Sequence, residues 1–244
     1  MPSIMSSDFA TNGYEVIENF VDSDTIAELK NEMYRLVSQF DLDEHYRQNG
    51  NPSVFTAGSD QKSDKYFLES GDKIRYFLEN DALGLKGELI VPKERSLNKI
   101  GHALHWWNPI FRRFTFQNKF KELARSLGLK EPLVVQSMII FKNPKIGGKV
   151  VEHQDATYLH TLPEPKGRVV GFWIPLADAT PDNGCLEFAP GSHLTQPLST
   201  RWIRTADPET GAIRMQHTDP NARYELDFMP VPAKAGKLFF SIDL

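Results

Sequence analysis

The first half of the chain combines one short strand pattern with two helical patterns. Residues 13–20 are rich in β-branched and aromatic side chains, which predicts a short strand. Residues 22–40 open with capping side chains and then place apolar residues on one helical face, which predicts a helix. Residues 41–65 are polar and rich in turn formers, so we expect a long loop. A second helical block is expected from Pro109, a favourable first-turn residue, to the terminating Gly128.

From residue 132 onward the pattern changes to short apolar runs that are separated by turn signals. Five runs are expected to be strands: residues 133–141, 168–176, 185–188, 226–231 and 237–242. Short strands at this spacing favour an all-β sandwich or barrel, packed against the N-terminal helices. We expect one domain over residues 1–244, with a helical part to about residue 130 and a β core from about 131 to 244.

The bulk composition is that of an ordinary globular protein. The chain has 244 residues, of which 40% are hydrophobic and 25% charged. A net charge of -4 gives no general electrostatic attraction to nucleic acid or anionic membranes. The single cysteine, Cys185, excludes an intramolecular disulfide. Because the sequence shows neither a secretory signal nor a membrane-spanning apolar run, we expect a cytoplasmic protein without nucleic-acid or membrane partners.

His153 and Asp155 form the most informative local pattern. They lie two residues apart, just after the glycine pair Gly147-Gly148. Side chains at this spacing point to the same face of a strand, about 7 Å apart along the chain, so both could reach one cation. An imidazole with a carboxylate suits Fe(II), Mn(II) or Zn(II), and two histidines with one carboxylate are typical of non-haem Fe(II) oxygenases. Taken alone the pair is weak evidence, and a solvated strand or a surface turn explains it more readily than a metal site does.

Further motifs follow the His-Gln-Asp sequence in a fixed order, namely an Asp-Asn-Gly-Cys-Leu turn and then Pro-Gly-Ser-His. They lie in the segments QSMIIFKNPKIGGKVVEHQDATYL, GRVVGFWIPLADATPDNGCLEFAPGSH and AGKLFFSIDL. These segments resemble the phytanoyl-CoA dioxygenase family of Fe(II)/2-oxoglutarate oxygenases. Two earlier segments, SGDKIRYF and RSLNKIGHALH, narrow the resemblance to the phytanoyl-CoA dioxygenase domain-containing subgroup. The resemblance extends from about Gly13 to the last residue.

The resemblance implies a fold that is mainly β with flanking α-helices. Its core would be a double-stranded β-helix (jelly roll, cupin-like) that is incomplete at the C-terminus. The implied enzyme uses Fe(II), 2-oxoglutarate as cosubstrate and O2 to hydroxylate an unidentified small-molecule substrate, with release of succinate and CO2. His153 and Asp155 would be the first two iron ligands. Gln154 would point to the opposite face and secure the strand, and its backbone could line the cosubstrate site.

By the same resemblance, Lys99, Met138 and Trp173 would line the 2-oxoglutarate site. A lysine ammonium can pair with a carboxylate, and Met138 and Trp173 would form an apolar wall that excludes water. Without the resemblance, plain core packing is the preferred interpretation of Met138 and Trp173.

The other histidines and the arginines carry less weight. In the family, the motif that contains His193 is a structural turn rather than a metal site. His102 and His105 are three residues apart, which predicts one helix face and a role in packing or at the substrate rim. His160 and His217 lie in polar loop contexts. Four arginines lie in a basic loop region that is more easily explained as solvated than as a substrate site: Arg201, Arg204, Arg214 and Arg223.

The family pattern continues past the point where this sequence stops. It implies a second iron histidine and then an arginine that pairs with the far carboxylate of 2-oxoglutarate. No His or Arg follows Arg223, and the sequence stops at Leu244. A polypeptide limited to these 244 residues is therefore expected to lack a charge-assisted cosubstrate contact and to show little or no 2-oxoglutarate turnover. Robust decarboxylation by the purified 244-residue polypeptide would contradict this expectation.

Two alternative hypotheses accompany the oxygenase. The first is a catalytically inactive truncated isoform or fragment that lacks the distal histidine and the 2-oxoglutarate-binding arginine. An in-frame His and Arg encoded after Leu244 would favour the enzyme over this alternative. The second is a cupin-like metal hydrolase, which is disfavoured because the match beyond the metal pair is to the oxygenases.

Overall fold

The computed structural model describes residues 7–50, 53–55, 64–159, 169–196, 198–204, 213–217 and 226–243. The chain forms two compact units, each of which combines segments that are distant in the sequence. The first unit consists of Met1–Ile26, Asn118–Pro132 and Glu152–Leu244. The second unit consists of Ala27–Gln117 and Leu133–Val151.

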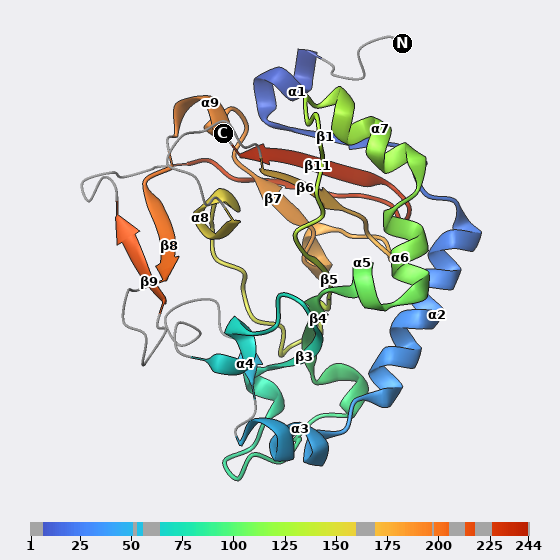
Figure 1. Ribbon diagram of the computed structural model, residues 1–244, viewed down its shortest axis with the longest axis vertical. Coiled ribbons are helices and arrows are strands. Elements are labelled where there is room, and N and C mark those ends of the chain that lie inside the picture. The colour runs from blue at the N-terminus through green and yellow to red at the C-terminus, as the bar shows by residue number, and fades with distance from the viewer. Residues whose placement is uncertain are drawn as a thin grey trace. The chain divides into compact units, whose positions relative to one another are not determined.

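The first unit is built on a three-stranded antiparallel sheet in the order β1-β11-β6 (Figure 1). Its strands and the two helices beside it are β1 (Tyr14–Ile17), β11 (Leu238–Asp243), β6 (Val169–Trp173), α1 (Ser7–Asn12) and α7 (Asn118–Ser126). Phe240 contacts Phe9 of α1, with 4.8 Å between ring centroids, and Phe172 contacts Phe120 of α7 at 6.0 Å. One face of the sheet is therefore covered by these two helices.

The opposite face of this sheet is lined by Gly171, Trp173, Phe239 and Ser241, because side chains alternate along a strand. Trp173 and Phe239 are paired in the ladder, with ring centroids 5.3 Å apart. Phe239 also stacks at 6.5 Å on Phe188. Phe188 belongs to a second small sheet of β7 (Leu186–Phe188) and β10 (Met229–Val231). We call the face that turns toward β7 the interior face, and this packing of two antiparallel sheets is that of a jelly roll.

The basic region expected to be a loop contains a hairpin of β8 (Thr200–Arg204) and β9 (Ile213–His217). Arg201, Arg204, Arg214 and His217 therefore lie in strands, and the loop expectation is wrong for them. One apolar side chain in this basic segment helps to hold β8 in place: Trp202 packs edge-on against Tyr158, with 5.3 Å between ring centroids. The remaining short elements of the first unit are α8 (Ala156–Leu159), α9 (Ser192–Thr195) and the 3-10 helix Pro181–Asn183.

The second unit contains a four-stranded sheet in the order β2-β3-β4-β5, in which β2 and β3 are parallel and the other pairs are antiparallel. Its strands are β2 (Val54–Phe55), β3 (Ile74–Glu79), β4 (Leu97–His102) and β5 (Ser137–Ile140). Its helices are α2 (Ser23–Gln39), most of which belongs to this unit, α3 (Leu42–Asn49), α4 (Lys65–Leu68), α5 (Leu104–Trp107) and α6 (Pro109–Thr115), with 3-10 helices at Asn80–Ala82 and Lys93–Arg95. Leu36 and Val37 of α2 form one core with Leu78, Ile100 and Ile139 of the sheet.

The helix expected over residues 22–40 is confirmed as α2, whereas two other expectations are wrong. The block 109–128 is two helices, α6 and α7, because α6 ends at the C-cap Phe116. The loop expected over 41–65 contains α3, whose N-cap Asp41 accepts a hydrogen bond from the Glu44 N–H and whose C-cap is the left-handed Gly50.

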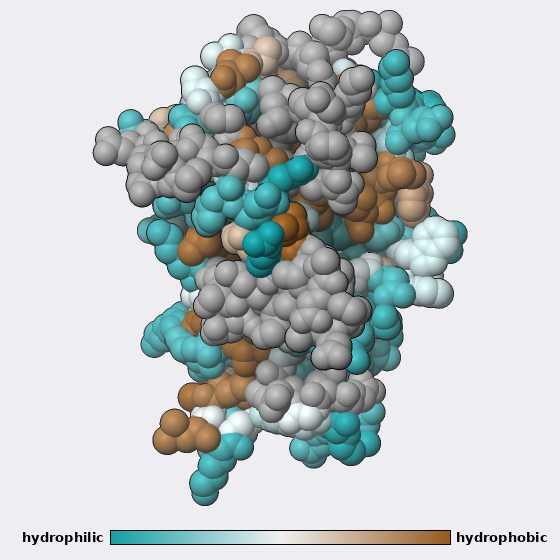
Figure 2. Space-filling view, turned by 60° about the vertical axis from the view of Figure 1, so that its left-hand side comes forward, coloured by the Kyte–Doolittle hydropathy of each residue, from teal (hydrophilic) through white to brown (hydrophobic). Residues whose placement is uncertain are grey.

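Each expected β run contains a strand, although most strands are shorter than the run. The largest difference is in residues 133–141, of which only Ser137–Ile140 pair with a neighbour. Figure 2 shows one face of the molecule, on which the described hydrophobic residues form separate areas among hydrophilic ones. Among the helices that the structure describes, none is both long and apolar enough to cross a membrane.

Candidate metal and cosubstrate site

His153 and Asp155 lie in a loop that leads into α8, and not in a strand as the sequence analysis expected. The backbone carbonyl of Asp155 accepts hydrogen bonds from the N–H groups of Tyr158 and Leu159 at 3.0 and 3.1 Å. These bonds turn the chain into a short helix in place of a strand ladder. The two side chains nevertheless converge, because Nε2 of His153 lies 3.3 Å from Oδ1 of Asp155.

Tyr158 flanks the pair, which stays accessible to solvent. The rings of His153 and Tyr158 meet edge to face, with 5.9 Å between centroids. Burial and the charge of Asp155 raise the pKa of the Tyr158 phenol, so this group stays protonated and neutral at physiological pH. The side chains of His153 and Asp155 are 35% and 46% exposed, so a ligand from solution can reach both.

Gln154 connects this loop to the segment that follows α9. Its side-chain amide donates a hydrogen bond to the backbone carbonyl of Gln196 at 3.1 Å. The bond anchors the residue between the two candidate ligands. The role of the Gln154 backbone at the cosubstrate stays a prediction.

Trp173 lies on the interior face of β6. It shares this face with Gly171, and a Cβ atom built on Gly171 would lie 3.5 Å from Oδ2 of Asp155. The Asp155 carboxylate therefore packs against the strand two residues from Trp173. Gly171 was not among the candidates predicted from the sequence, although a glycine inside a strand pattern is a known signal of close approach.

The two donor atoms fit a shared metal ion. A nitrogen and an oxygen that are each about 2.1 Å from one ion, at a right angle, lie about 3 Å apart. The observed separation of 3.3 Å is close to this value. Imidazole nitrogen and carboxylate oxygen are also donors that suit Fe(II). Within the described ranges, no group of three His, Cys, Asp or Glu side chains is arranged to hold a metal ion.

Lys99 is a buried cation in the second unit. It is 5% exposed and lies in β4 opposite Phe77 of β3. Its ammonium is 5.0 Å from the ring centroid of Phe67 and 5.2 Å from that of Phe77. Desolvation lowers the pKa of Lys99 to about 7. Because burying an ammonium costs free energy, a lysine in this setting is a candidate functional group.

Met138 shares a sheet face with Lys99. It pairs with Gly101 in the β4-β5 ladder, and Lys99 pairs with Ile140 two positions along. A Cβ built on Gly101 would lie 3.1 Å from the Cβ of Met138, so the methionine packs directly over this glycine. The predicted site residues thus form two groups. Lys99 and Met138 belong to the second unit, and the first unit contains His153, Gln154, Asp155 and Trp173.

His102 and His105 do not share a helix face as expected, because β4 ends at His102 and α5 begins at Leu104. Nδ1 of His102 lies 2.7 Å from Oγ of Ser70, and the Ser70 hydroxyl donates to the Phe67 carbonyl at 2.6 Å. Since that hydroxyl has one proton, Nδ1 of His102 is the donor to Ser70. Burial and the Lys99 charge lower the pKa of His102 to about 3, so its ring is neutral.

The remaining candidate residues from the sequence belong to neither of these two groups. His193 packs against α1, where its Nε2 lies 3.1 Å from the Ala10 carbonyl oxygen and its ring occupies the space next to Gly13. This packing agrees with the structural role expected for the motif. His160 and Arg223 lie outside the described residues.

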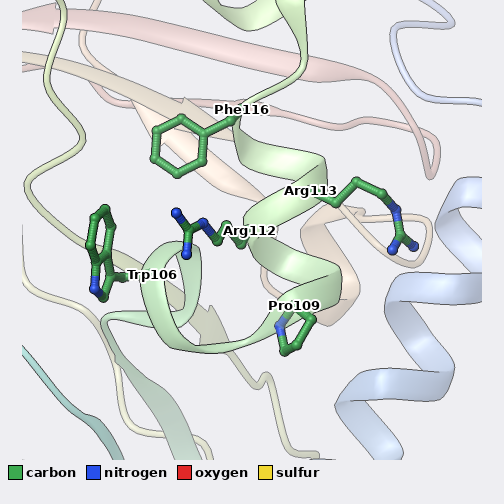
Figure 3. Close-up of a pocket in the computed structure, with 5 residues that line it drawn as sticks. All are labelled: Trp106, Pro109, Arg112, Arg113 and Phe116. Carbon is green, nitrogen blue, oxygen red and sulfur yellow. The ribbon is translucent and has the colours of Figure 1, made fainter.

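A surface hollow of about 620 Å³ in the second unit is lined by Trp106, Pro109, Arg112, Arg113 and Phe116 (Figure 3). The Arg112 guanidinium lies 4.7 Å from the ring centroid of Trp106. Arg113 points away from this pair and forms an ion pair with Glu28 at 2.5 Å. Among the described residues that line the hollow, none carries an imidazole, thiolate or carboxylate, so its chemistry differs from that of the His153–Asp155 pair.

Solved structures identify the fold. The epimerase SnoN from nogalamycin biosynthesis, solved with Fe3+, alpha ketoglutarate and nogalamycin RO, superposes with a TM-score of 0.55 at 15% identity over 97% of this chain and 72% of SnoN. EctD from S. alaskensis with bound Fe gives a TM-score of 0.55 at 16% identity over 97% of this chain and 68% of EctD. The fold is therefore the double-stranded β-helix of the 2-oxoglutarate-dependent non-haem iron enzymes.

Sequence comparison identifies the family. Residues 9–244 match the model of Phytanoyl-CoA dioxygenase (PhyH). Phytanoyl-CoA dioxygenase domain-containing protein 1 of Bos taurus is 44% identical over 230 residues, which are 94% of this chain and 78% of the relative. A Phytanoyl-CoA dioxygenase of Arabidopsis thaliana is 42% identical over 232 residues, 94% of this chain and 76% of the relative. The chain belongs to the phytanoyl-CoA dioxygenase family.

Proposed function

We propose that the protein is an Fe(II)- and 2-oxoglutarate-dependent dioxygenase that hydroxylates a small molecule. The observation that carries this proposal is the convergence of His153 Nε2 and Asp155 Oδ1 to 3.3 Å beside Gly171, in a fold shared with iron- and 2-oxoglutarate-binding enzymes. Family membership supports the same chemistry.

In this proposal the chain's own residues bind, orient and exclude water. His153 and Asp155 hold the metal through Nε2 and Oδ1, and the Gln154–Gln196 hydrogen bond keeps their loop in place. When bound, Fe(II) with 2-oxoglutarate activates O2 for oxidation of a C–H bond.

Lys99, Met138 and Trp173 are proposed to contact 2-oxoglutarate. In its protonated form, the Lys99 ammonium pairs with a carboxylate of this dianion, and low local dielectric strengthens the pair. Met138 and Trp173 provide apolar surface that keeps water from the reacting atoms. The proposed substrate class is no narrower than a small molecule, because the solved neighbours include an epimerase and a carbocyclase and the fold alone does not set the reaction.

Anaerobic titration with Fe(II) and then 2-oxoglutarate tests the proposal. We expect a metal-to-ligand charge-transfer band on addition of 2-oxoglutarate, and succinate formation once O2 is admitted. The titration is run on the gene product with any in-frame residues encoded beyond Leu244, and in parallel on the 244-residue polypeptide. A longer product that never shows the band contradicts the proposal, whereas a band in the longer product alone indicates that the shorter polypeptide is the inactive form.

A further inference from the structure

The two oxygen atoms of the Asp155 carboxylate have different surroundings. Oδ1 lies 3.3 Å from Nε2 of His153. Oδ2 lies against β6, where a Cβ built on Gly171 would be 3.5 Å away. Oδ1 is therefore placed beside the imidazole donor, and Oδ2 is directed to the interior face of the sheet.

Space, rather than backbone conformation, explains the glycine at position 171. Its φ lies outside the positive range, so a residue with a side chain can adopt the same backbone conformation. An added Cβ would nevertheless be 3.3 Å from Oγ of Ser241, a tight contact, as well as 3.5 Å from Oδ2 of Asp155. The missing side chain thus leaves room above β6 that the Ser241 hydroxyl and the Asp155 carboxylate both border.

Ser241 is held opposite this space by the sheet. It pairs with Gly171 in the β11–β6 ladder and with Tyr14 in the β1–β11 ladder, so its position along the strand is fixed on both sides. Within the described part of the chain, its hydroxyl forms no hydrogen bond to another group. A hydroxyl next to a carboxylate oxygen has a strong acceptor available, because hydrogen bonds to charged acceptors are about twice as strong as neutral ones.

We propose that Ser241 is a positioning residue for the metal site: when Asp155 holds a divalent cation through Oδ1, the Ser241 hydroxyl, which has no described partner in this structure, turns to donate a hydrogen bond to Oδ2 of Asp155 across the space above Gly171. This bond fixes the carboxylate with Oδ1 toward a divalent cation. The inference rests on the proposed function, since it takes Asp155 to be a metal ligand. Partners of this kind orient a ligating carboxylate, and their loss costs about 10–100-fold in metal affinity.

Mn(II) binding to the metal-free protein, measured by calorimetry and by the electron paramagnetic resonance signal of free Mn(II), tests this role without turnover. Ser241→Ala is expected to raise the Kd for Mn(II) about 10–100-fold while the thermal unfolding midpoint of the metal-free protein stays unchanged. Ser241→Thr keeps the hydroxyl and suits a strand, so it is expected to restore a Kd close to that of the wild type.

Glycine substitutions provide a second, matched pair. Gly171→Ala is expected to raise the Kd for Mn(II) because the added methyl group pushes Ser241 and Asp155 apart. Gly71→Ala is the control, since a Cβ at Gly71 meets no atom within 4 Å and should leave the Kd unchanged.

The outcomes separate this inference from the proposed function. If Mn(II) binding depends on His153 but Ser241→Ala binds with the wild-type Kd, the positioning role is overturned and the metal site stands. Equal weakening by the alanine and threonine variants also overturns it. Wild-type protein that binds Mn(II) no better than His153→Ala would overturn both the metal site and the role of Ser241.

Discussion

Asp155→Asn is expected to abolish Fe(II) binding and, with it, 2-oxoglutarate decarboxylation. Asparagine has the size of aspartate, so the packing against Gly171 is retained, but a neutral amide replaces the charged donor that lies 3.3 Å from Nε2 of His153. Loss of a residue that only hydrogen-bonds to a metal ligand weakens metal binding about 10–100-fold. Loss of the ligand itself should weaken binding by more than this. Anaerobic titration with Fe(II) and 2-oxoglutarate measures the loss of the charge-transfer band, and succinate analysis measures the loss of turnover.

His153→Gln should give the same result, and His193→Gln is the matched control. His193 belongs to the same unit, but its ring packs beside Gly13 and contacts the Ala10 carbonyl. The control variant should therefore bind metal like the wild type, with a lower thermal unfolding midpoint from lost packing. An Asp155→Asn protein with a wild-type band, or a His193→Gln protein without one, would show that the metal is held elsewhere.

The strands that position the candidate site were predictable because each is an apolar run. Val169–Trp173 and Leu238–Asp243 are nearly continuous in apolar residues, since one face packs on α1 and α7 and the other turns toward β7. Their pairing was not predictable, because the register that sets Ser241 opposite Gly171 depends on segments 70 residues apart in the sequence.

Two predictions of local structure were wrong for different reasons: the loop over residues 41–65 and the strand at His153 and Asp155. The signals for α3 were present in the sequence, since Asp41 is a favourable N-cap and Gly50 a favourable C-cap, yet the polar composition of the segment favoured a loop. The strand expected at His153 and Asp155 rested on their two-residue spacing alone, which suits a strand but does not require one. In the structure, hydrogen bonds to the Asp155 carbonyl start α8 instead.

The environment of Lys99 lies beyond sequence reasoning altogether. A lysine in a polar-apolar segment such as Asn-Lys-Ile is expected to be exposed. Its burial arises because β3 and α4 place Phe77 and Phe67 beside its ammonium, and both residues are more than 20 positions away in the sequence. Only the family resemblance singled out this residue, and its contact with 2-oxoglutarate stays a prediction.

Lys99→Met is expected to stabilise the protein while it weakens 2-oxoglutarate binding. Burial of the Lys99 ammonium costs free energy, as its pKa of about 7 shows, so an apolar side chain of similar length should raise the free energy of unfolding. Loss of a hydrogen bond to a charged group costs about 1.5–3 kcal/mol, so affinity for 2-oxoglutarate should fall roughly 10–100-fold. Denaturant unfolding without ligand and the anaerobic 2-oxoglutarate titration measure the two effects. Lys142→Met, at an exposed position after β5, is the control and should change neither.

The pH dependence distinguishes a buried ammonium from ordinary packing. The pKa of Lys99 is lowered to about 7 in the folded protein, from 10.5 for a free side chain. Between these values the unfolded chain binds more protons, so the free energy of unfolding of the wild type should rise with pH across this window. Lys99→Met lacks this contribution, and its stability advantage should therefore shrink as the pH rises from 7 toward 10.5.

Wild-type affinity for 2-oxoglutarate should fall as the pH rises through 7, because the ammonium is lost. A stability advantage and an affinity loss that are both independent of pH would show that Lys99 is not the titrating cation of the site.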